Sequence, residues 1–353
     1  MSVRIVSAAA LAAGDEAFDA VIDARSPAEF ADDHLPGAVN WPVLDDAERA
    51  LVGTLYKQAG ALAARQAGAP LAARRIAAHL EREMPGKARD WRPLVYCWRG
   101  GQRSGTLAWF LGQIGFRSAQ LAGGYKAWRA LVRTGLDPLP ARLRWRVLCG
   151  RTGSGKTRLL QALADQGAQV LDLEGLARHR GSVLGALPDA PQPSQKRFEH
   201  LLWQALRGFD PARPVYVESE SRRIGALRVP EALLGELREH GDCLRLEPPF
   251  EARVALLLQD YAHFAADADA FGRLLEPLAE LRGRAAVAGW QALARAGDWP
   301  ALYAQLMREH YDPLYERSLR GNFRRLAQAE VRARPDAAPA TLRAAAARLI
   351  AAA

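Results

Sequence analysis

Cysteine is scarce in this sequence of 353 residues, since Cys97, Cys149 and Cys243 are the only three. They lie far apart and their number is odd, so the pattern predicts neither a disulfide framework nor a zinc site. No apolar run approaches the ~20 residues that a membrane-spanning helix requires. The N-terminal stretch, with Asp15 and Glu16, does not have the layout of a signal peptide. We therefore expect a cytoplasmic protein that does not contact a membrane.

Lysine is also rare, because only five of the 48 basic residues are lysines. The formal net charge is nevertheless +9, and a basic chain suits a polyanionic partner such as RNA. A compositional bias toward arginine and alanine explains the charge equally well, so charge alone does not identify a partner. Hydrophobic residues make up 49% and charged residues 25%, which is ordinary for a globular chain long enough for two domains.

Strands alternate with helices through the first third of the sequence. Residues 18–25 and 94–96 predict buried strands, and residues 44–84 have the apolar spacing of helices. Ser26 is the expected N-cap of a further helix, because proline follows it at once and glutamate three residues later. Residues 117–128 predict a short strand, a Gly-Gly turn and a helix. This alternation indicates a mostly parallel α/β sheet.

Cys97 stands where the strand over residues 94–96 ends and just before a helical pattern begins. A tight loop between a strand and a helix points its backbone N–H groups inward, which favours an anion at its centre. A thiol held there has a lowered pKa and is a ready nucleophile. The remaining residues of this predicted anion loop are Trp98, Arg99, Gly100, Gly101, Gln102, Arg103 and Ser104.

Features spread over about residues 5–133 resemble the rhodanese family. They are Asp23-x-Arg25, the loop His34-x-Pro36-Gly37-Ala38-x-Asn40, Cys97 at a strand end, and Leu121-x-Gly123-Gly124 followed by Trp128. Rhodanese domains carry sulfur or selenium on the loop cysteine as a persulfide-type adduct. Arg103 is the sixth residue after Cys97, one position later than in the usual sulfurtransferase loop and similar to rhodanese-like phosphatases. A phosphatase therefore stays open, although the loop carries no carboxylate to act as its general acid.

A second motif follows a linker that is rich in proline and glycine. The strand over residues 143–149 runs into Gly150-Arg151-Thr152-Gly153-Ser154-Gly155-Lys156-Thr157, which matches G-x-x-x-x-G-K-[ST] in full. The glycines let the backbone wrap a phosphate, the lysine places a charge on it, and the threonine can bind Mg²⁺. The sequence predicts a phosphate site formed by Gly150, Gly153, Ser154, Gly155, Lys156 and Thr157.

Other polar residues stand at predicted strand ends, where open α/β sheets bind ligands. Residues 170–174 and 214–218 predict two more strands, and the second ends in Glu218, where an ATPase usually places aspartate. As supporting residues of the phosphate site we name Glu218, Glu220, Arg222, Arg223, His179, Arg180 and Ser182. From residue 249 onward the pattern is helical with no clear strand, and the tail from residue 320 is rich in arginine, which suits RNA.

The anion loop, the phosphate loop, His179-Arg180-Gly181-Ser182 and residues 218–225 together resemble the bacterial tRNA 2-selenouridine synthase family. The resemblance spans at least residues 5–230. It implies that wobble 2-thiouridine in the tRNAs for Lys, Glu and Gln is S-geranylated from geranyl diphosphate. Selenium from selenophosphate then replaces the S-geranyl group.

The same resemblance implies a role for each loop. The phosphate loop would bind the diphosphate of the geranyl donor, with Mg²⁺ on Thr157. Cys97 would carry selenium as a selanyl-sulfide adduct, and Arg103 and Arg99 would favour its anionic form and attract selenophosphate. Our own hypothesis, beyond the resemblance, is that the longer anion loop leaves room for selenium or selenophosphate. No tightly bound cofactor is expected.

We therefore expect an α/β protein in three parts. A rhodanese-like domain covers residues 1–133, and after a linker at 134–142 a P-loop NTPase-like parallel α/β domain covers residues 143–248. A helical region at 249–353 is expected to contact tRNA. The main alternative is an ATP-dependent sulfurtransferase acting on tRNA or a small molecule, which predicts ATP turnover. The intact cysteine and phosphate loop disfavour a third alternative, a non-enzymatic RNA-binding protein.

Overall fold

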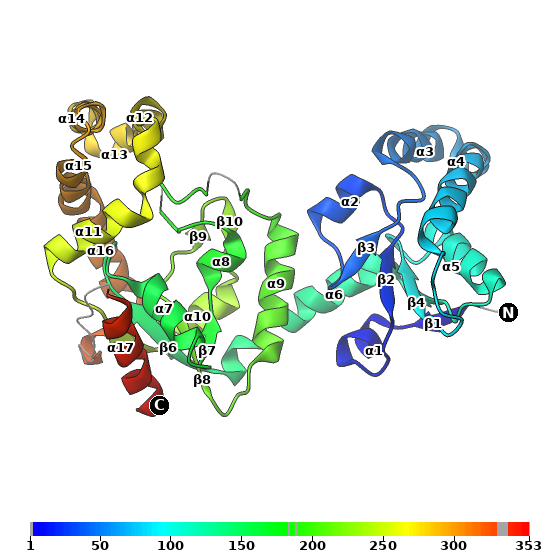
Figure 1. Ribbon diagram of the computed structural model, residues 1–353, viewed down its shortest axis with the longest axis horizontal. Coiled ribbons are helices and arrows are strands. Elements are labelled where there is room, and N and C mark those ends of the chain that lie inside the picture. The colour runs from blue at the N-terminus through cyan, green and yellow to red at the C-terminus, as the bar shows by residue number, and fades with distance from the viewer. Residues whose placement is uncertain (1–2, 183, 188–189, 330–337, 353) are drawn as a thin grey trace. The chain divides into compact units, whose positions relative to one another are not determined.

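The computed structural model describes residues 3–182, 184–187, 190–329 and 338–352 (Figure 1). The chain forms two compact units. The first consists of Met1–Gly135 together with Pro193–His200, and the second of Leu136–Gln192 together with Leu201–Ala353.

The first unit is built around a parallel sheet, as the sequence predicted, with five strands in the order β1-β5-β4-β2-β3. The strands are β1 (Arg4–Val6), β2 (Ala20–Asp23), β3 (Ala38–Asn40), β4 (Pro93–Tyr96) and β5 (Ala119–Leu121). The helices are α1 (Ala8–Ala13), α2 (Pro27–Asp32), α3 (Asp46–Gln58), α4 (Gly60–Glu83), α5 (Gln102–Ile114) and α6 (Gly124–Leu136).

The core of this unit fixes the end of β4, where the cysteine lies. Ile22 of β2 and Val95 of β4 belong to one buried cluster with Leu107 and Leu111 of α5. Cys97 is part of the same cluster, so its position depends on sheet and helix packing rather than on the loop alone. The predicted start of α2 is confirmed, since Ser26 and the glutamate at the third helical position form a capping box.

The second unit contains a parallel four-stranded sheet in the order β11-β6-β8-β7. Its strands are β6 (Arg144–Cys149), β7 (Gln169–Leu171), β8 (Pro214–Glu218) and β11 (Asp242–Arg245), and a separate hairpin pairs β9 (Arg223–Ile224) with β10 (Leu227–Arg228). Its helices are η1 (Pro140–Arg142), α7 (Lys156–Ala164), α8 (Leu173–Ala177), the later part of α9 (Gln195–Gly208), and α10 (Glu231–Glu239).

Two details of this sheet differ from the sequence prediction. The strand expected over residues 170–174 ends at Leu171, because the Asp172 side chain accepts the N–H of Gly175 at 2.8 Å and starts α8. Strand β11 was not predicted, since its four residues do not form a strong apolar pattern. The early start of α8 brings Glu174 onto a helix at the carboxyl edge of the sheet.

Beyond residue 249 the described part of the chain is helical and contains no strand, as predicted. Its elements are α11 (Phe250–Asp260), η2 (Ala262–Ala266), α12 (Ala268–Leu275), η3 (Glu276–Leu278), α13 (Ala279–Arg282), α14 (Arg284–Arg295), α15 (Trp299–Leu306), the π-helical turn η4 (Met307–Tyr311), α16 (Asp312–Asn322), η5 (Leu326–Gln328) and α17 (Pro339–Ala351).

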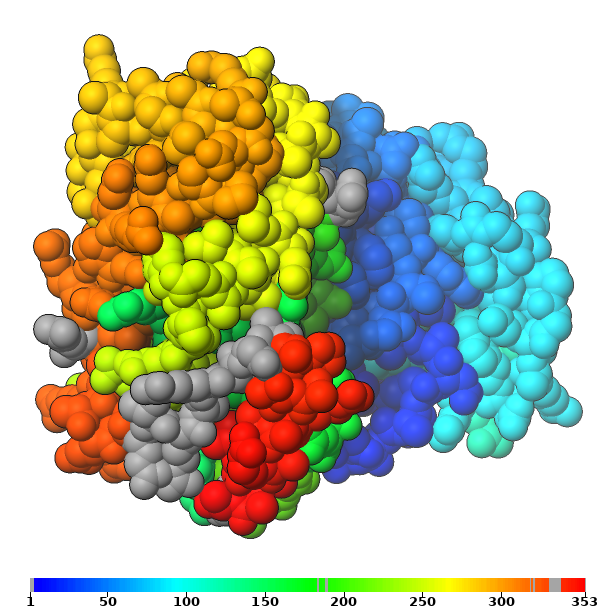
Figure 2. Space-filling view, turned by 60° about the vertical axis from the view of Figure 1, so that its left-hand side comes forward, coloured from blue at the N-terminus to red at the C-terminus, as the bar shows by residue number. Residues whose placement is uncertain are grey.

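The last helix, α17, belongs to the core of the phosphate-loop unit. Leu342 and Leu349 of α17 share one buried cluster with Leu159 and Leu163 of α7. Its other side is exposed, and Figure 2 shows it in red on the surface of the molecule. Two arginines of the predicted basic tail, Arg332 and Arg334, lie outside the described residues, so RNA contact by the tail stays a prediction.

Candidate active site

Cys97 lies directly after β4 and is only 3% exposed. The hydroxyl of Ser104 donates a hydrogen bond to the Cys97 sulfur at 3.1 Å. The amide nitrogen of Gln120, on β5, in turn donates to the Ser104 oxygen at 2.9 Å and to the carbonyl of Gly100 at 2.7 Å. Because the Ser104 oxygen accepts from Gln120, the hydrogen of this hydroxyl is available to the sulfur, and the two bonds fix the position of Cys97. The only signal for Gln120 in the sequence is a polar residue inside a buried three-residue strand.

A glycine turn holds the anion loop in place. The N–H groups of Tyr125 and Lys126 donate to the carbonyls of Cys97 and Trp98 at 2.8 and 2.9 Å. This approach requires Gly124, whose φ is +56°, because a Cβ there would lie 2.2 Å from the Cys97 carbonyl oxygen. The Gly-Gly signal in the sequence therefore has a steric cause: the turn is packed against the backbone of the reactive cysteine.

We expect Gly124→Ala to displace Cys97 and slow its reaction with iodoacetamide. Gly14→Ala is the matched control, because Gly14 also has a left-handed φ, +76°, but nothing lies within 4 Å of its Cβ position. Both changes cost about 1–2 kcal/mol of backbone strain, whereas only Gly124→Ala adds a collision with the anion loop. Mass spectrometry of the Cys97 peptide gives the alkylation rate. Equal rates in the two variants would contradict this account of the turn.

The two arginines predicted to act in this loop, Arg103 and Arg99, differ in their surroundings. Arg103 donates to Glu29 at 2.7 Å, and Arg99 is exposed. Burial acts to raise the pKa of Glu29, but the hydrogen bond and charge of Arg103 hold that pKa below its ordinary value. Glu29 is therefore ionised at neutral pH and lacks the proton that a phosphatase general acid must donate.

The outer face of the anion loop is open to ligands. Gly101 and Gln102 line a cavity of about 430 Å³ together with Trp109, whose side chain is 48% exposed. Trp98 instead stacks on Tyr125 with ring centroids 5.4 Å apart. Glycine N–H groups and an exposed aromatic ring suit a small anion that arrives beside a larger, partly apolar molecule.

The phosphate loop joins β6 to α7, as the motif predicted. Gly155 caps α7 with φ +79°, and the Lys156 ammonium donates to the carbonyl of Gly150 at 2.8 Å. Burial acts to lower the pKa of Lys156, but Tyr315 and three glutamates raise it above its ordinary value, so the ammonium stays charged. A helix N-terminus and a fixed positive charge thus lie together, which is the arrangement that binds a phosphate.

Helices of the C-terminal region hold this loop in shape. The guanidinium of Arg253, on α11, donates twice to the carbonyl of Thr152 at 2.9 and 2.8 Å and pairs with Asp312. The hydroxyl of Tyr315, on α16, accepts the N–H of Gly150 at 2.9 Å. Arg253 is 3% exposed, so its bonds are made in a buried setting where their loss is costly. No local pattern in the sequence indicates either contact.

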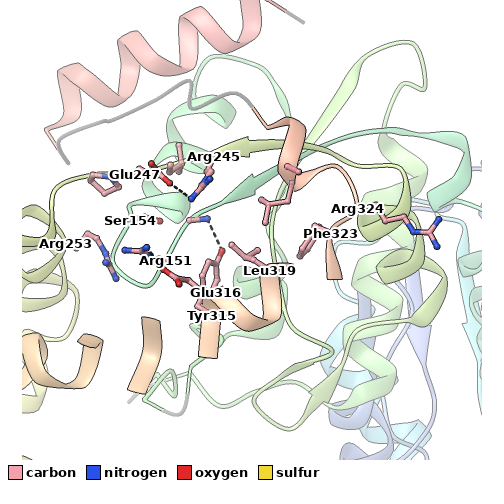
Figure 3. Close-up of a pocket in the computed structure, with 15 residues that line it drawn as sticks. Arg151, Ser154, Arg245, Glu247, Arg253, Tyr315, Glu316, Leu319, Phe323 and Arg324 are labelled. Atoms are coloured by element: carbon pink, nitrogen blue, oxygen red, sulfur yellow. Dashed lines mark hydrogen bonds and ion pairs between the residues drawn. The ribbon is translucent and has the colours of Figure 1, made fainter. Parts of the chain in front are cut away.

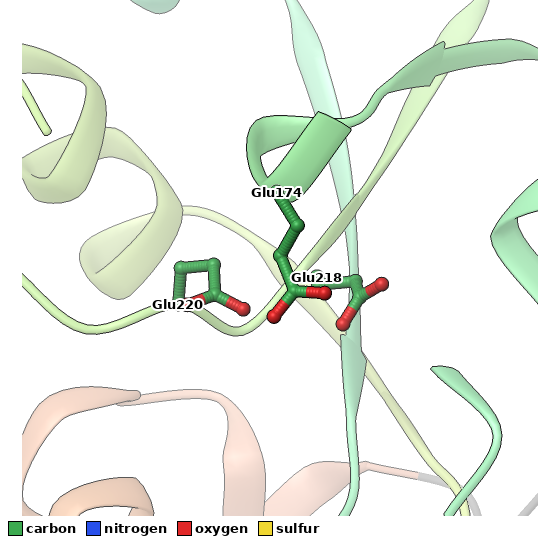
Figure 4. Close-up of side chains that lie close together, drawn as sticks. All are labelled: Glu174, Glu218 and Glu220. Atoms are coloured by element: carbon green, nitrogen blue, oxygen red, sulfur yellow. The ribbon is translucent and has the colours of Figure 1, made fainter. Parts of the chain in front are cut away.

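Three carboxylates gather beside the phosphate loop (Figure 4). Glu174 comes from α8, Glu218 from the end of β8 and Glu220 from the loop after it, and oxygens of all three lie within 4.8 Å of one another. Burial and the neighbouring glutamates raise the pKa of Glu174 to about 9, and burial and Glu218 raise that of Glu220 to about 7. Among the described residues, Oε1 of Glu218 is buried without a hydrogen-bond partner. A bound cation would coordinate this oxygen and would also reduce the repulsion among the three carboxylates.

The phosphate-loop cavity, of about 390 Å³, joins this polar end to an apolar wall. Arg180 and Ser182, two of the supporting residues named from the sequence, line it. The Arg180 guanidinium lies 5.2 Å from the centre of the Tyr261 ring. The apolar wall consists of Leu256, Leu257, Tyr261, Leu314, Leu319 and Phe323.

The other predicted supporting residues lie elsewhere in the unit. His179 is buried and accepts the N–H of Gly181 at its Nδ1, 3.1 Å away. Arg222 pairs with Glu231, and Arg223 is exposed on β9. The described lining of the phosphate-loop cavity includes none of these three predicted residues.

A buried thiol on an anion loop and a phosphate loop on a separate parallel sheet define a two-domain protein of the rhodanese and P-loop classes. Family models match both parts: a rhodanese-like domain at residues 7–131, and a tRNA 2-selenouridine synthase AAA domain at residues 143–274. The chain belongs to the tRNA 2-selenouridine synthase family, and it is accordingly a transferase enzyme.

Relatives named tRNA 2-selenouridine synthase support this assignment. The protein of Nitrosomonas europaea is 38% identical over 245 residues, which cover 68% of this chain and 63% of that protein. Those of Verminephrobacter eiseniae and Cupriavidus necator are 37% and 38% identical over 84% of this chain and 87% of theirs. No helix in the described part of the chain is long and apolar enough to cross a membrane.

Proposed function

We propose that this enzyme converts wobble 2-thiouridine of tRNA to 2-selenouridine in two steps. In the phosphate-loop cavity the enzyme S-geranylates the thiouridine with geranyl diphosphate. At the Cys97 loop it then transfers selenium from selenophosphate. The observation that carries the proposal is the joining of a phosphate cradle to an apolar wall in one cavity. Such a cavity matches a ligand with a diphosphate at one end and a hydrocarbon chain at the other.

The first step requires a good leaving group. The sulfur of 2-thiouridine attacks C1 of the geranyl chain, the C1–O bond breaks, and diphosphate leaves. The N–H groups at the start of α7 and the charged Lys156 stabilise the diphosphate as it departs. Leu256, Leu257 and Leu314 pack against the chain and exclude water, which would otherwise hydrolyse the donor.

A divalent cation such as Mg²⁺ fits the carboxylate cluster. Thr157, Glu174, Glu218 and Glu220 would hold it, since these oxygen donors are the kind that Mg²⁺ prefers and Glu218 has an unsatisfied buried oxygen. When bound, the cation neutralises charge that develops on the departing diphosphate. No water-activating aspartate is needed, which agrees with the place of Glu218 at the end of β8.

The second step exchanges sulfur for selenium. Alkylation turns the thiocarbonyl sulfur into a leaving group. The selenium of selenophosphate bound at the Cys97 loop attacks C2, the C2–S bond breaks and geranyl thiol departs. Water then cleaves the Se–P bond, which releases phosphate and leaves 2-selenouridine. Ser104 and Gln120 hold the sulfur of Cys97 in place, and the glycines of the loop offer N–H groups to the selenophosphate anion.

The test is a two-stage incubation. RNA with 2-thiouridine is mixed with enzyme and geranyl diphosphate, then with selenophosphate, and nucleoside masses are read after each addition. We expect S-geranyl-2-thiouridine after the first addition and 2-selenouridine after the second, without ATP. A reaction that needs ATP and leaves the thiouridine unchanged by geranyl diphosphate would favour the ATP-dependent sulfurtransferase.

The carboxylate cluster also predicts how stability depends on pH. Since the pKa of Glu174 is raised from 4.5 to about 9, the folded protein holds a proton that the unfolded chain releases at lower pH. Stability from this group is therefore lost as pH rises toward 9. In EDTA at high pH, near the raised pKa, Glu174→Gln is expected to raise Tm by about 2–4 °C, with little difference in acid, while stabilisation by Mg²⁺ is reduced.

Thermal unfolding followed by circular dichroism, with and without Mg²⁺, measures both effects. Glu280→Gln, at an exposed position on α13, is the control and should change neither. A Glu174→Gln protein that is less stable than wild type at high pH in EDTA would contradict the crowded-charge description of the cluster.

A further inference from the structure

A second cavity, of about 590 Å³, adjoins the phosphate loop and has no part in the reaction described above (Figure 3). Its wall combines charged and apolar groups. Arg151 and Arg245 reach it from the phosphate loop and the end of β11. Arg324 lines it from the segment after α16, but its guanidinium points away and pairs with Glu239. Its apolar surface is formed by Leu246, Pro248, Leu319, Phe323, Leu326 and Ala327.

We propose that this cavity binds a nucleotide of the RNA substrate, with a phosphate at the arginines and the base against the apolar wall. The inference rests on the proposed function, because it takes RNA as the acceptor. It goes further by placing the RNA contact in the arginine cavity and the prenyl donor in the phosphate-loop cavity.

The phosphates of the donor and of the RNA need separate binding sites. In the phosphate-loop cavity, Lys156 and the start of α7 are assigned to the diphosphate of the donor. The neighbouring arginine cavity presents the guanidinium groups of Arg151 and Arg245. These two cations suit a phosphate of the RNA backbone.

The arginines of this cavity are already paired, but with exposed partners. Arg151 pairs with Glu316 and Arg245 with Glu247, and all four side chains are between 39% and 46% exposed. Ion pairs this exposed contribute little to stability, so a phosphate can replace the carboxylate at small cost. Arg253, by contrast, is buried and bound to the phosphate loop and to α16, and we assign it no RNA contact.

The two cavities share part of their walls. Ser154, Tyr315, Leu319 and Phe323 line both. A nucleotide in the arginine cavity therefore lies against the same side chains as the geranyl donor, as an acceptor of that donor must. The apolar wall also suits a base, since flat rings gain from contact with aromatic and aliphatic surface.

The experiment measures RNA binding without donor, so that it does not depend on geranylation. A fluorescent anticodon stem-loop RNA with 2-thiouridine is titrated with full-length enzyme, and anisotropy gives Kd at several salt concentrations. Arg245→Ala is expected to weaken binding about tenfold and to reduce the slope of log K against log salt by about 0.7–0.9. Arg295→Ala, which removes an exposed arginine paired with Asp269, is the matched control and should leave both unchanged.

A second variant, with the opposite expected effect on RNA binding, distinguishes a lost RNA contact from a folding defect. Glu247→Gln removes a carboxylate from the same cavity and is expected to tighten RNA binding several-fold. Geranyl diphosphate binding, measured by calorimetry, should be unaffected by either change.

If Arg245→Ala binds RNA like wild type, the RNA assignment is wrong. If the variant instead binds geranyl diphosphate more weakly, the cavity holds the donor. A wild-type enzyme that binds this RNA but never geranylates it would overturn the proposed function and leave the assignment of the cavity intact.

Discussion

Cys97→Ala is expected to reduce selenium incorporation to background while S-geranylation of thiouridine RNA continues at the wild-type rate. The reason is the proposed division of the two steps between two sets of residues. The Cys97 sulfur is held by Ser104 and Gln120 in the first unit, whereas the described lining of the phosphate-loop cavity belongs to the second. The thiol contributes nothing to the phosphate loop, which is the proposed diphosphate site.

Mass spectrometry of digested RNA measures both products in one sample. In the Cys97→Ala reaction S-geranyl-2-thiouridine should accumulate, because the second step no longer consumes it. Cys97→Ser is the companion variant: its hydroxyl can keep a hydrogen bond with Ser104, so equal loss of selenium transfer identifies the sulfur, rather than the shape of the loop, as essential. Equal loss of both products would contradict the division of the two steps.

Lys156→Ala is expected to slow S-geranylation about 10²–10³-fold, the usual effect of removing one group that stabilises a departing charge. The ammonium lies beside Tyr315 and the carboxylate cluster. At this buried position water cannot take over the stabilising role of the lost positive charge. The initial rate of geranylation, measured with saturating RNA, gives the effect. The same variant supplied with RNA that is already S-geranylated should still form 2-selenouridine.

Rescue by geranylated RNA separates this outcome from misfolding, because a misfolded enzyme loses both steps. Lys156→Arg preserves the charge but not the compact ammonium, and an intermediate rate is expected. Should Lys156→Ala geranylate normally but lose an ATPase activity of the wild type, the ATP-dependent alternative would be correct.

The features predicted from the sequence are those whose cause is local. A buried strand, a glycine loop and the start of a helix follow one another directly both at Cys97 and at the phosphate loop, so their geometry depends on neighbouring residues. The parallel sheets followed from the alternation of such segments. Strand β11 was not predicted, because so short a segment shows no clear hydrophobic period.

The parts of the sites that could not be predicted depend on contacts between distant residues. Tyr315 binds Gly150 across 165 positions, and Arg253 binds Thr152 across 101. Nothing in the sequence near Glu174 indicates that it meets the other two glutamates, since that meeting depends on the order of β7 and β8 in the sheet. The pairing of Arg103 with a glutamate of α2 is likewise a tertiary contact, and its role toward selenophosphate stays a prediction.

The packing of α17 on α7 has a consequence for how the enzyme is made. The helix that begins at the phosphate loop completes its apolar contacts only with Leu342, Ala346 and Leu349, which are synthesised long after the loop itself. The first unit needs no residue beyond His200, and domains generally fold as they emerge from the ribosome. A nascent chain therefore passes through a stage with a formed Cys97 loop and an unfinished phosphate-loop site. The two sites mature during translation in the reverse of the order proposed for their action on RNA.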